Sequence, residues 1–416
     1  LRRDGINAFS AKGFVTNSYD IAKAIRETAN AEFSVEDIRD AVIGELTKSG
    51  RLTAGDAKST CPEISGECQS LSPHSESAQC DMYWDDVSGK TLHPDLVKRA
   101  REEEMKHIRN MNVYCKVPVE QCFQATGKQP IGTRWVDINK SDDEDPQYRS
   151  RLVAKEVNTH KRDDLFAATP PLEAQKLLLS FAVTRGIGYG SSKSKGMKLD
   201  FIDIRRAYYH ANVRREVFVE LPPEDHEEGM CAKLVKAMPG TRDAAQNWEC
   251  EYSAWLKSIG FVSGKSSPCL FHHPSKELRL VVHGDDFTLL GNGGNLDWFR
   301  SEIAKRYEVK FRGRIGPSKD DQKSITILNR AVTWTDEGIL YECDQRHADL
   351  IVSSLGLQGS NSRVTPGVKS DCHEDSKTLC GKDHVMFRSN VARGIYISQD
   401  RPDVSFAVKE LSRQQS

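Results

Sequence analysis

The sequence is organised around Leu278-Arg-Leu-Val-Val-His-Gly-Asp-Asp-Phe-Thr-Leu-Leu290, in which apolar and β-branched residues lead up to a pair of acids and resume after it. Residues 280–282 are typical of a buried strand, and residues 287–289 continue the same pattern beyond the acids. Gly284 favours a tight turn between the two strands. The stretch therefore predicts a hairpin that carries Asp285 and Asp286 at its tip.

A third acid, Asp203, lies in Lys198-Leu-Asp-Phe-Ile-Asp-Ile-Arg-Arg-Ala-Tyr-Tyr209, whose apolar residues predict a neighbouring strand. Three carboxylates at one point repel each other unless cations lie between them. Such oxygen-rich clusters suit Mg²⁺, with Mn²⁺ as a substitute. Two such ions roughly 3.5–4 Å apart can hold the attacking and leaving oxygens of a phosphoryl transfer. Asp-Asp beside Gly is also a common turn sequence, so the metal interpretation depends on the rest of the chain.

A series of further motifs runs in order from about residue 84 to residue 416, about four fifths of the chain. The motifs are Pro130-Ile-Gly-Thr-Arg-Trp-Val136, Tyr148-Arg-Ser-Arg-Leu-Val-Ala-Lys155, the Asp203 stretch, Val217-Phe-Val-Glu-Leu-Pro-Pro-Glu224, residues 231–248, residues 260–271, the Gly-Asp-Asp turn, Arg363-Val-Thr-Pro366, Phe387-Arg-Ser-Asn-Val391 and Arg401-Pro-Asp-Val-Ser-Phe-Ala-Val408. Together they resemble the reverse transcriptase of copia-type LTR retrotransposons. The ordered series, rather than any one motif, is what makes the resemblance specific.

Strands and helices mix without a regular βαβ repeat, which indicates an α+β fold with an antiparallel sheet. The pattern predicts strands over residues 130–138 and 148–157 and helices over 94–112, 172–184 and 244–259. In the second helix, Leu177, Leu178, Phe181 and Ala182 are expected to point inward. The resemblance implies a right-hand polymerase over residues 84–416, with fingers near 113–200, a palm near 200–320 and a thumb or connection near 321–416.

The resemblance implies roles for particular residues. Asp203 and Asp285 would be the main ligands of two Mg²⁺ ions, with Asp286 supporting them. Other residues would bind the incoming nucleotide or the template. These are Arg151 and Lys155 at the triphosphate, Tyr208 under the sugar where it excludes a 2′-hydroxyl, and Gly240 and Arg242 at the template.

Each of these roles has a structural alternative. Arg149, Arg151 and Lys155 share a parity on the strand and can form one cationic face, which suits phosphates but also describes an ordinary basic surface strand. The alternative for Tyr208 is a buried aromatic residue on a strand. Lys310 could lie near the leaving pyrophosphate or be a solvated lysine on a strand.

Two motifs depart from the family pattern. The family usually has a Tyr two positions before the Asp pair and a Val or similar apolar residue directly before it, whereas this chain has His283 and Gly284. The template-contacting motif usually carries Gln-Ala-Pro-Arg, whereas this chain has Asp243-Ala-Ala-Gln246. The second departure loses a proline and reverses a charge.

The composition is that of a globular protein with a core: 38% of the 416 residues are hydrophobic and 29% are charged. The net charge is −1, so any affinity for nucleic acid must come from local basic patches. The sequence has neither an apolar run long enough to span a membrane nor a secretory signal pattern. Its 11 cysteines are scattered, which indicates an intracellular, reduced setting.

The N-terminal part has no recognised family. The apolar spacing within residues 1–58 predicts a small helical unit. Residues 59–83 are rich in Ser, Cys, Gly and Pro, which indicates a linker. Cys61, Cys68, His74 and Cys80 cluster there, but their spacing is looser than zinc patterns and we expect no metal site. The chain begins with Leu rather than Met, which suggests a fragment of a polyprotein.

The first functional hypothesis is an RNA-directed DNA polymerase that uses an RNA template, a DNA primer and deoxynucleoside triphosphates. The resemblance implies that RNase H and integrase come from other parts of a polyprotein, and that the protein works in a cytoplasmic particle or the nucleus without a membrane partner. The alternative is an inactive relic or domesticated scaffold that binds nucleic acid or protein on the same fold. A nuclease using the same acids lacks support from the ordered motifs.

Overall fold

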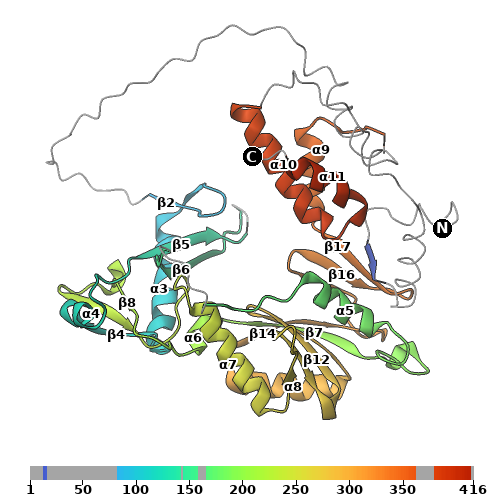
Figure 1. Cartoon of the computed structure of the whole chain (residues 1–416), viewed down its shortest axis with the longest axis horizontal. Helices are drawn as coiled ribbons and strands as arrows, with labels where there is room; N and C mark the ends of the chain where they lie inside the picture. Colours follow the sequence, from blue (N-terminus) through green and yellow to red (C-terminus); the bar gives the residue numbers. More distant parts are fainter. Residues whose placement is uncertain (1–12, 16–81, 142–143, 158–164, 362–378, 414–416) are drawn as a thin grey trace, which may run out of the picture. The chain divides into compact units, whose positions relative to one another are not determined.

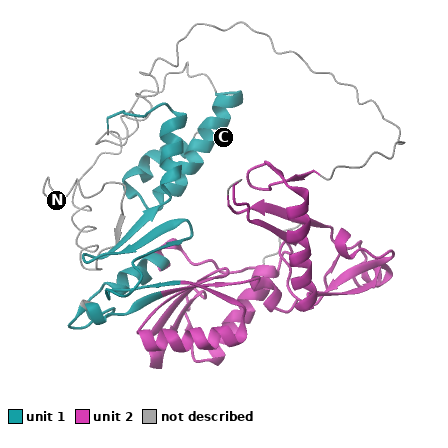
Figure 2. Ribbon diagram, turned by 180° about the vertical axis from the view of Figure 1, so that it is seen from behind, with its two compact units in different colours: residues 1–68, 175–199, 313–416 teal, residues 69–174, 200–312 magenta. Residues whose placement is uncertain are grey.

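The computed structural model describes residues 13–15, 82–141, 144–157, 165–361 and 379–413 (Figure 1). The described residues fall into two compact units (Figure 2). Unit 1 contains residues 13–15, 175–199 and 313–413, and unit 2 contains residues 82–174 and 200–312, with the gaps given above. The predicted catalytic acids all belong to unit 2.

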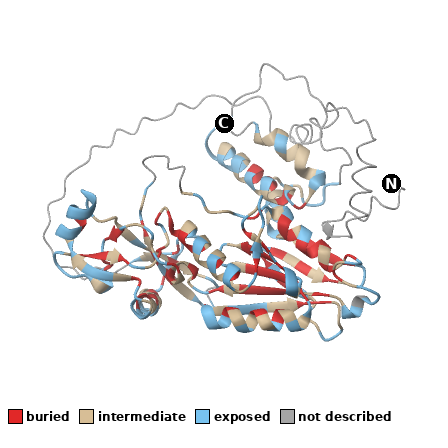
Figure 3. Ribbon diagram, turned by 60° about the horizontal axis from the view of Figure 1, so that its bottom comes forward, coloured by how far each residue is buried: buried red, intermediate tan, exposed pale blue. Residues whose placement is uncertain are grey.

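A six-stranded sheet forms the centre of unit 2, in the order β10-β11-β12-β13-β7-β14. The strands from β10 to β13 pair antiparallel. Helices α7 (Ala244–Ser258) and α8 (Gly293–Arg306) lie on the same side of this sheet (Figure 1) and bury Trp248 and Phe299 against it. Figure 3 shows the buried residues concentrated in these strands. The strands are β7 (Lys198–Ile204), β10 (Val262–Ser263), β11 (Leu270–His273), β12 (Leu278–His283), β13 (Asp286–Gly291) and β14 (Val309–Ile315).

A second core in unit 2 surrounds helix α3 (Pro94–Asn110) and the β5–β6 hairpin. Met105 and Ile108 of α3 pack with Leu152 of β6 in this core. The Arg101 guanidinium of α3 also pairs with Asp137 of β5, with Nη2 2.6 Å from Oδ2. The other elements of this part are β2 (Tyr83–Trp84), β3 (Thr91–Leu92), β4 (Tyr114–Pro118), α4 (Val119–Thr126), β5 (Thr133–Asn139), β6 (Tyr148–Ala154), α6 (Ala207–His210), β8 (Phe218–Val219) and β9 (Met230–Leu234).

Unit 1 consists of a four-stranded sheet, in the order β1-β17-β16-β15, and helices. Its strands are β1 (Gly13–Val15), β15 (Ser324–Ile327), β16 (Arg330–Trp334) and β17 (Ile339–Cys343). Its helices are α9 (Gln345–Ser354), α10 (Gly381–Ser398), α11 (Pro402–Ser412) and most of α5 (Leu172–Ala182). Strand β1 pairs antiparallel with β17 and lies within the stretch predicted to be a helical unit. The rest of that stretch, and the cysteine cluster of the linker, lie outside the described residues.

The fold confirms the predicted α+β class. The helices predicted over residues 94–112, 172–184 and 244–259 are present as α3, α5 and α7, and the central hairpin is present as β12–β13. The prediction that Leu177 points inward is wrong, because its exposed fraction is 49%. Leu178 and Ala182 are buried as predicted, and Ala174 and Leu179 complete the buried face of α5. In the described part of the chain, no helix combines the length and apolar character needed to cross a bilayer.

Candidate active site

The Gly-Asp-Asp sequence forms the tip of the β12–β13 hairpin. His283 pairs with Asp286, which leaves Gly284 and Asp285 as a two-residue loop. Gly284 takes the first central position with φ of 64°, where hairpin turns of this length favour glycine. The indole of Trp248 in α7 donates a hydrogen bond of 2.8 Å from Nε1 to the Gly284 carbonyl oxygen. The turn is therefore fixed to the buried face of the sheet, and Asp285 is exposed at its end.

Asp203 lies beside this turn, near the end of β7. Strand β7 is the neighbour of β13 in the sheet, and the Ile204 amide donates to the Asp285 carbonyl oxygen at 2.9 Å. Partial burial raises the pKa of Asp286, and the negative charges of Asp285 and Asp203 raise it further. The structure thus brings the three predicted acids into one electrostatic environment, although they come from strands about 80 residues apart in the sequence.

A cation from the protein already faces one of these acids. Arg312 of β14 places Nη1 3.1 Å from Asp286 Oδ1, and this pairing partly counteracts the rise in the pKa of Asp286. Among the described residues, no three His, Cys, Asp or Glu side chains are grouped closely enough to hold a metal ion as they stand. The donor set itself, three carboxylates in one field, has the hard-oxygen chemistry that Mg²⁺ prefers. The three acids therefore fit a divalent ion by chemistry, and the side chains would have to close around it.

Basic residues of the β5–β6 hairpin lie within electrostatic reach of Asp203. Arg149 and Arg151 lie two positions apart on β6, and Arg151 is exposed. Loss of hydration lowers the pKa of Lys140, and the charges of Arg149 and Arg151 lower it further, whereas Asp203 raises it. Lys310 of β14 also lowers the pKa of Lys140. Lys140 therefore lies within electrostatic reach of Asp203 and of three other cations, and Arg149 is also within reach of Asp203, a local excess of positive charge that suits an anionic substrate.

Lys155 lies at the far end of β6, directly after Ala154. Its amide donates to the Gly132 carbonyl oxygen at 2.8 Å, and its side chain is exposed. A Cβ built on Gly132 would lie 2.8 Å from Lys155 Cε. The Lys155 side chain therefore folds over Gly132, four positions along the strand from Arg151.

Tyr208 stands next to the acids on the short helix α6. Its ring is partly buried against the core of the six-stranded sheet. Burial raises the pKa of Tyr208, and so does the charge of Asp285, whereas Arg151 lowers it. The phenol therefore lies within electrostatic reach of Asp285 and of Arg151.

Gly240 belongs to a loop that runs against the end of β6. Its φ is 87°, and a Cβ at this position would lie 2.0 Å from the Ala154 carbonyl oxygen. The Ala154 amide donates to the Pro239 carbonyl oxygen at 2.8 Å, and the Arg242 amide donates to Glu156 at 2.8 Å. The glycine is thus required for close packing of this loop on the hairpin that carries Arg151.

We expect Gly240→Ala to lower the free energy of unfolding by about 2–3 kcal/mol, because it adds both a positive-φ penalty and a backbone clash. Denaturant unfolding of the purified variant measures this. Gly294→Ala on α8 is the matched control, since a Cβ there meets no atom within 4 Å. Equal stability of the two variants would contradict the packing role of Gly240.

The unusual Asp243 of this motif is a buried, paired acid. Its exposed fraction is 3%. Its Oδ1 accepts from Arg215 Nη2 at 2.8 Å, and its Oδ2 accepts from Asn247 Nδ2 at 3.0 Å. Arg215 also bonds Glu156 at 2.6 Å. The negative charge that Asp243 adds to the motif is therefore compensated inside the protein and is not free at the surface.

The Asp243 pairing predicts a pH-dependent contribution to stability. Burial alone would raise the pKa of Asp243, but Arg215 and Asn247 outweigh it and hold that pKa below its ordinary value of 3.8. A carboxyl group whose pKa is lower in the folded state stabilises the protein at pH values above its unfolded-state pKa. This contribution is lost as the pH falls through the folded-state pKa. Asp243→Asn should therefore be less stable than wild type at about pH 7, with a smaller difference at about pH 3.5. Urea unfolding at both pH values checks this, and a difference that does not depend on pH would contradict it.

Comparison with known proteins decides the family. Residues 121–369, more than half of the chain, match the family described as reverse transcriptase (RNA-dependent DNA polymerase). The chain belongs to this family. The matched range of the reverse transcriptase domain includes every residue predicted for the site.

The relatives are retrotransposon proteins, which confirms the copia-type resemblance. The retrovirus-related Pol polyprotein from transposon TNT 1-94 of Nicotiana tabacum is 22% identical over 347 residues, 77% of this chain and 24% of that protein. The corresponding protein from transposon RE1 of Arabidopsis thaliana is 24% identical over 294 residues, 68% of this chain and 19% of that protein. The chain thus spans about a quarter or less of the curated relatives that it matches.

Among solved structures, a foamy viral protease-reverse transcriptase in complex with double-stranded DNA matches with a TM-score of 0.38 and 11% identity. The match covers 78% of this chain and 49% of that one.

Two cations of the site were missed by sequence reasoning. Lys140 follows β5 directly, and its amide donates to the Gln147 carbonyl oxygen at 2.9 Å. The predicted hairpin would already place Lys140 across from the strand that carries Arg149. The acidic residues of the neighbouring loop drew attention away from this lysine. Arg312 had no local signal, because its partner Asp286 lies 26 positions earlier.

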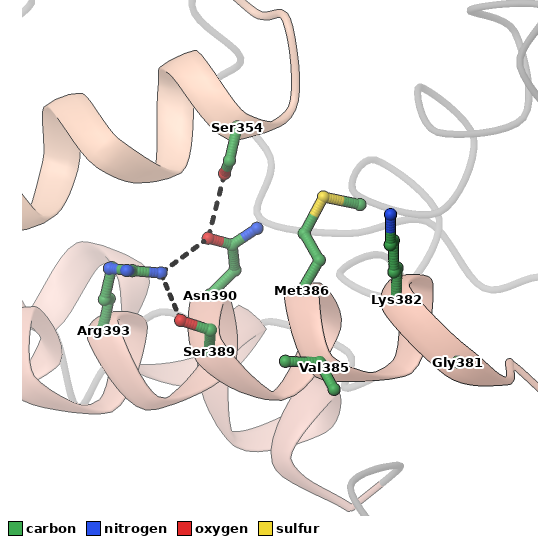
Figure 4. Close-up of a pocket in the computed structure, with 8 residues that line it drawn as sticks. All are labelled: Ser354, Gly381, Lys382, Val385, Met386, Ser389, Asn390 and Arg393. Atoms are coloured by element: carbon green, nitrogen blue, oxygen red, sulfur yellow. Dashed lines mark hydrogen bonds between the residues drawn. The ribbon is translucent and has the colours of Figure 1, made fainter. Parts of the chain in front are cut away.

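Unit 1 contains a cavity of about 590 Å³ (Figure 4). It opens between the end of α9 and the first turns of α10, where Ser354 donates to Asn390 Oδ1 at 3.0 Å. None of the predicted site residues lines it. Its lining residues are Ser354, Gly381, Lys382, Val385, Met386, Ser389, Asn390 and Arg393.

Proposed function

We propose that this chain is the RNA-directed DNA polymerase portion of a copia-type retrotransposon polyprotein, acting by two-metal nucleotidyl transfer. The observation that carries the proposal is the convergence of Asp203, Asp285 and Asp286 in one field, with cations of the β5–β6 hairpin beside them. Family membership over residues 121–369 supports the same activity. The substrates would be an RNA template, a DNA primer and deoxynucleoside triphosphates.

In this proposal the acids hold the metal ions and the cations hold the substrate. Asp203 and Asp285 would be the main ligands, with Asp286 supporting them. Bound Mg²⁺ supplies Lewis-acid stabilisation of the attacking hydroxyl and of the leaving group. The primer 3′-hydroxyl would lose its proton to water and its oxygen would bond to the α-phosphorus, whose bond to the bridging oxygen would break to release pyrophosphate. Arg151, Lys155 and Lys140 would neutralise the triphosphate as this charge shifts.

The remaining residues would select and align the substrates. Tyr208 would lie under the sugar and exclude a 2′-hydroxyl. Gly240 and Arg242 would approach the template, with Gly240 also fixing the loop against β6. We further propose that fingers, palm and thumb or connection occupy about residues 113–200, 200–320 and 321–416, and that RNase H and integrase belong to other parts of the polyprotein. The work would take place in a cytoplasmic particle or the nucleus.

The test is incorporation of labelled dTTP by the purified chain on poly(rA)·oligo(dT). We expect incorporation with Mg²⁺, none after addition of excess EDTA, and recovery with Mn²⁺, because carboxylate sites accept either ion. A folded chain that binds the primer-template but incorporates nothing with either metal would replace this proposal with the non-catalytic scaffold.

A further inference from the structure

Helix α3 contributes a buried carboxylate to the region behind the site. Glu104 has an exposed fraction of 7%, which is unusual for a glutamate unless it is paired. Its two oxygens have different partners: Oε2 accepts from Arg206 Nε at 3.1 Å, and Oε1 accepts from the Tyr209 hydroxyl at 3.1 Å. One carboxylate therefore joins α3 to two residues of the segment that follows Asp203.

These two residues flank Tyr208 in the sequence. Tyr209 is buried in the core around α3, whereas Tyr208 packs against the core of the six-stranded sheet. Arg206 has φ of 51°, a left-handed conformation that a non-glycine residue adopts at a cost and keeps only where its surroundings fix it. The Glu104 carboxylate supplies such a fixed contact.

The backbone before Arg206 is fixed as well. The Ile204 amide donates to the Asp285 carbonyl oxygen, and the Arg205 amide donates to the Glu308 carbonyl oxygen, both at 2.9 Å. After Arg206, the Tyr209 amide donates to the Arg206 carbonyl oxygen at 2.9 Å. The position of Tyr208 relative to Asp285 is therefore set by main-chain bonds on one side and by Glu104 on the other.

We infer that Glu104 is a positioning residue that sets the discrimination between deoxyribonucleotides and ribonucleotides through Arg206 and Tyr209, without touching the substrate. The inference rests on the proposed function, because it requires Tyr208 to meet the sugar. In the proposed function, the Tyr208 ring excludes a 2′-hydroxyl by its position, whereas the strand end that carries Asp203 is held to Asp285 by the Ile204 main-chain bond, which does not involve Glu104. Loosening the Tyr208 segment should therefore reduce selectivity before it reduces synthesis.

The experiment compares kcat/KM for dTTP with kcat/KM for UTP on poly(rA)·oligo(dT). Glu104→Gln keeps the shape but loses the charge, and Tyr209→Phe removes one of the two bonds while the charge of Glu104 remains. Glu103→Gln is the matched control, since Glu103 is the exposed neighbour on the same helix. Tyr208→Ala gives the ratio without the aromatic ring, and melting curves establish that each variant is folded.

We expect the dTTP/UTP ratio to fall about tenfold in Glu104→Gln, which is the effect of losing one charge-assisted hydrogen bond. Tyr209→Phe should show a smaller fall, and Glu103→Gln should show none. If Glu104→Gln fails to fold, the ratio in Tyr209→Phe decides, and an unchanged ratio there overturns the inference.

The other outcomes separate this inference from the proposed function. An unchanged ratio in folded Glu104→Gln, or an equal fall in both rates, reduces Glu104 to a structural role and leaves the polymerase assignment intact. An unchanged dTTP/UTP ratio in Tyr208→Ala would show that Tyr208 does not exclude the 2′-hydroxyl, and the inference about Glu104 would fail with it. Incorporation of dTTP would still support the polymerase. A wild-type chain that incorporates no dTTP overturns both.

Discussion

Asp285→Asn is expected to lower dTTP incorporation about a thousandfold, since a metal ion contributes several kcal/mol to transition-state stabilisation and each 1.36 kcal/mol is a factor of about ten. The substitution keeps the size of the side chain, and asparagine is well tolerated in tight turns. The Asp285 carbonyl oxygen would still accept the bond from Ile204. The fold should therefore survive while the metal ligand is lost, and single-turnover primer extension measures the effect.

The matched control is Asp297→Asn, which makes the same chemical change at an exposed position of α8 in the same unit. Its rate should equal that of wild type. Asp286→Asn should lie between the two, because the proposed mechanism gives Asp286 a supporting role and Asp286 already has Arg312 as a partner. Unimpaired extension by Asp285→Asn would show that the metal ligands have been assigned to the wrong residues.

The second large effect concerns stability and arises in unit 1. Asp400, in the turn between α10 and α11, places Oδ2 2.7 Å from Arg330 Nε of β16. Lys176 Nζ of α5 lies 3.0 Å from Oδ1 as an ion pair. Arg330 and Asp400 have exposed fractions of 5% and 9%. We expect Asp400→Asn to lower the free energy of unfolding by about 3–5 kcal/mol, because it leaves the Arg330 charge buried without its partner.

Denaturant unfolding followed by circular dichroism measures this loss. The exposed pair of Arg401 and Asp403, at 2.6 Å, is the control three residues away, and Asp403→Asn should cost about 1 kcal/mol or less. Adding Arg330→Met to Asp400→Asn should restore part of the stability, since the uncompensated charge is then removed. A loss no larger than that of Asp403→Asn would show that the buried pair does not hold these three segments together.

The sequence was sufficient for the central hairpin because its signals are local. Only one register of the two strands around Gly284 buries the apolar residues of both. The pairing of His283 with Asp286 then follows from a two-residue loop. The same reasoning placed Asp203 on a strand, and the family pattern then placed that strand beside the hairpin. Tyr208 followed from its spacing to Asp203.

The contacts that support the site could not be predicted in this way. Glu104 meets Arg206 across 102 positions, and Arg215 meets Asp243 across 28, so no local pattern reports either pair. Asp243 read as a charge reversal near the template, and only its burial beside Arg215 shows that it is compensated. Leu177 was misplaced because a run of three leucines fits more than one helical face, and packing selected Leu178 and Leu179.

The most direct test of the account is the copying of a defined RNA of mixed sequence from an annealed DNA primer, with all four deoxynucleoside triphosphates and Mg²⁺. The product is sequenced, and wild type is compared with Asp285→Asn under the same conditions. The account predicts complementary DNA from wild type, and none above background from the variant. Equal product from both would contradict the assignment of the active site, and no product from a folded wild-type chain that binds the primer-template would contradict the polymerase function itself.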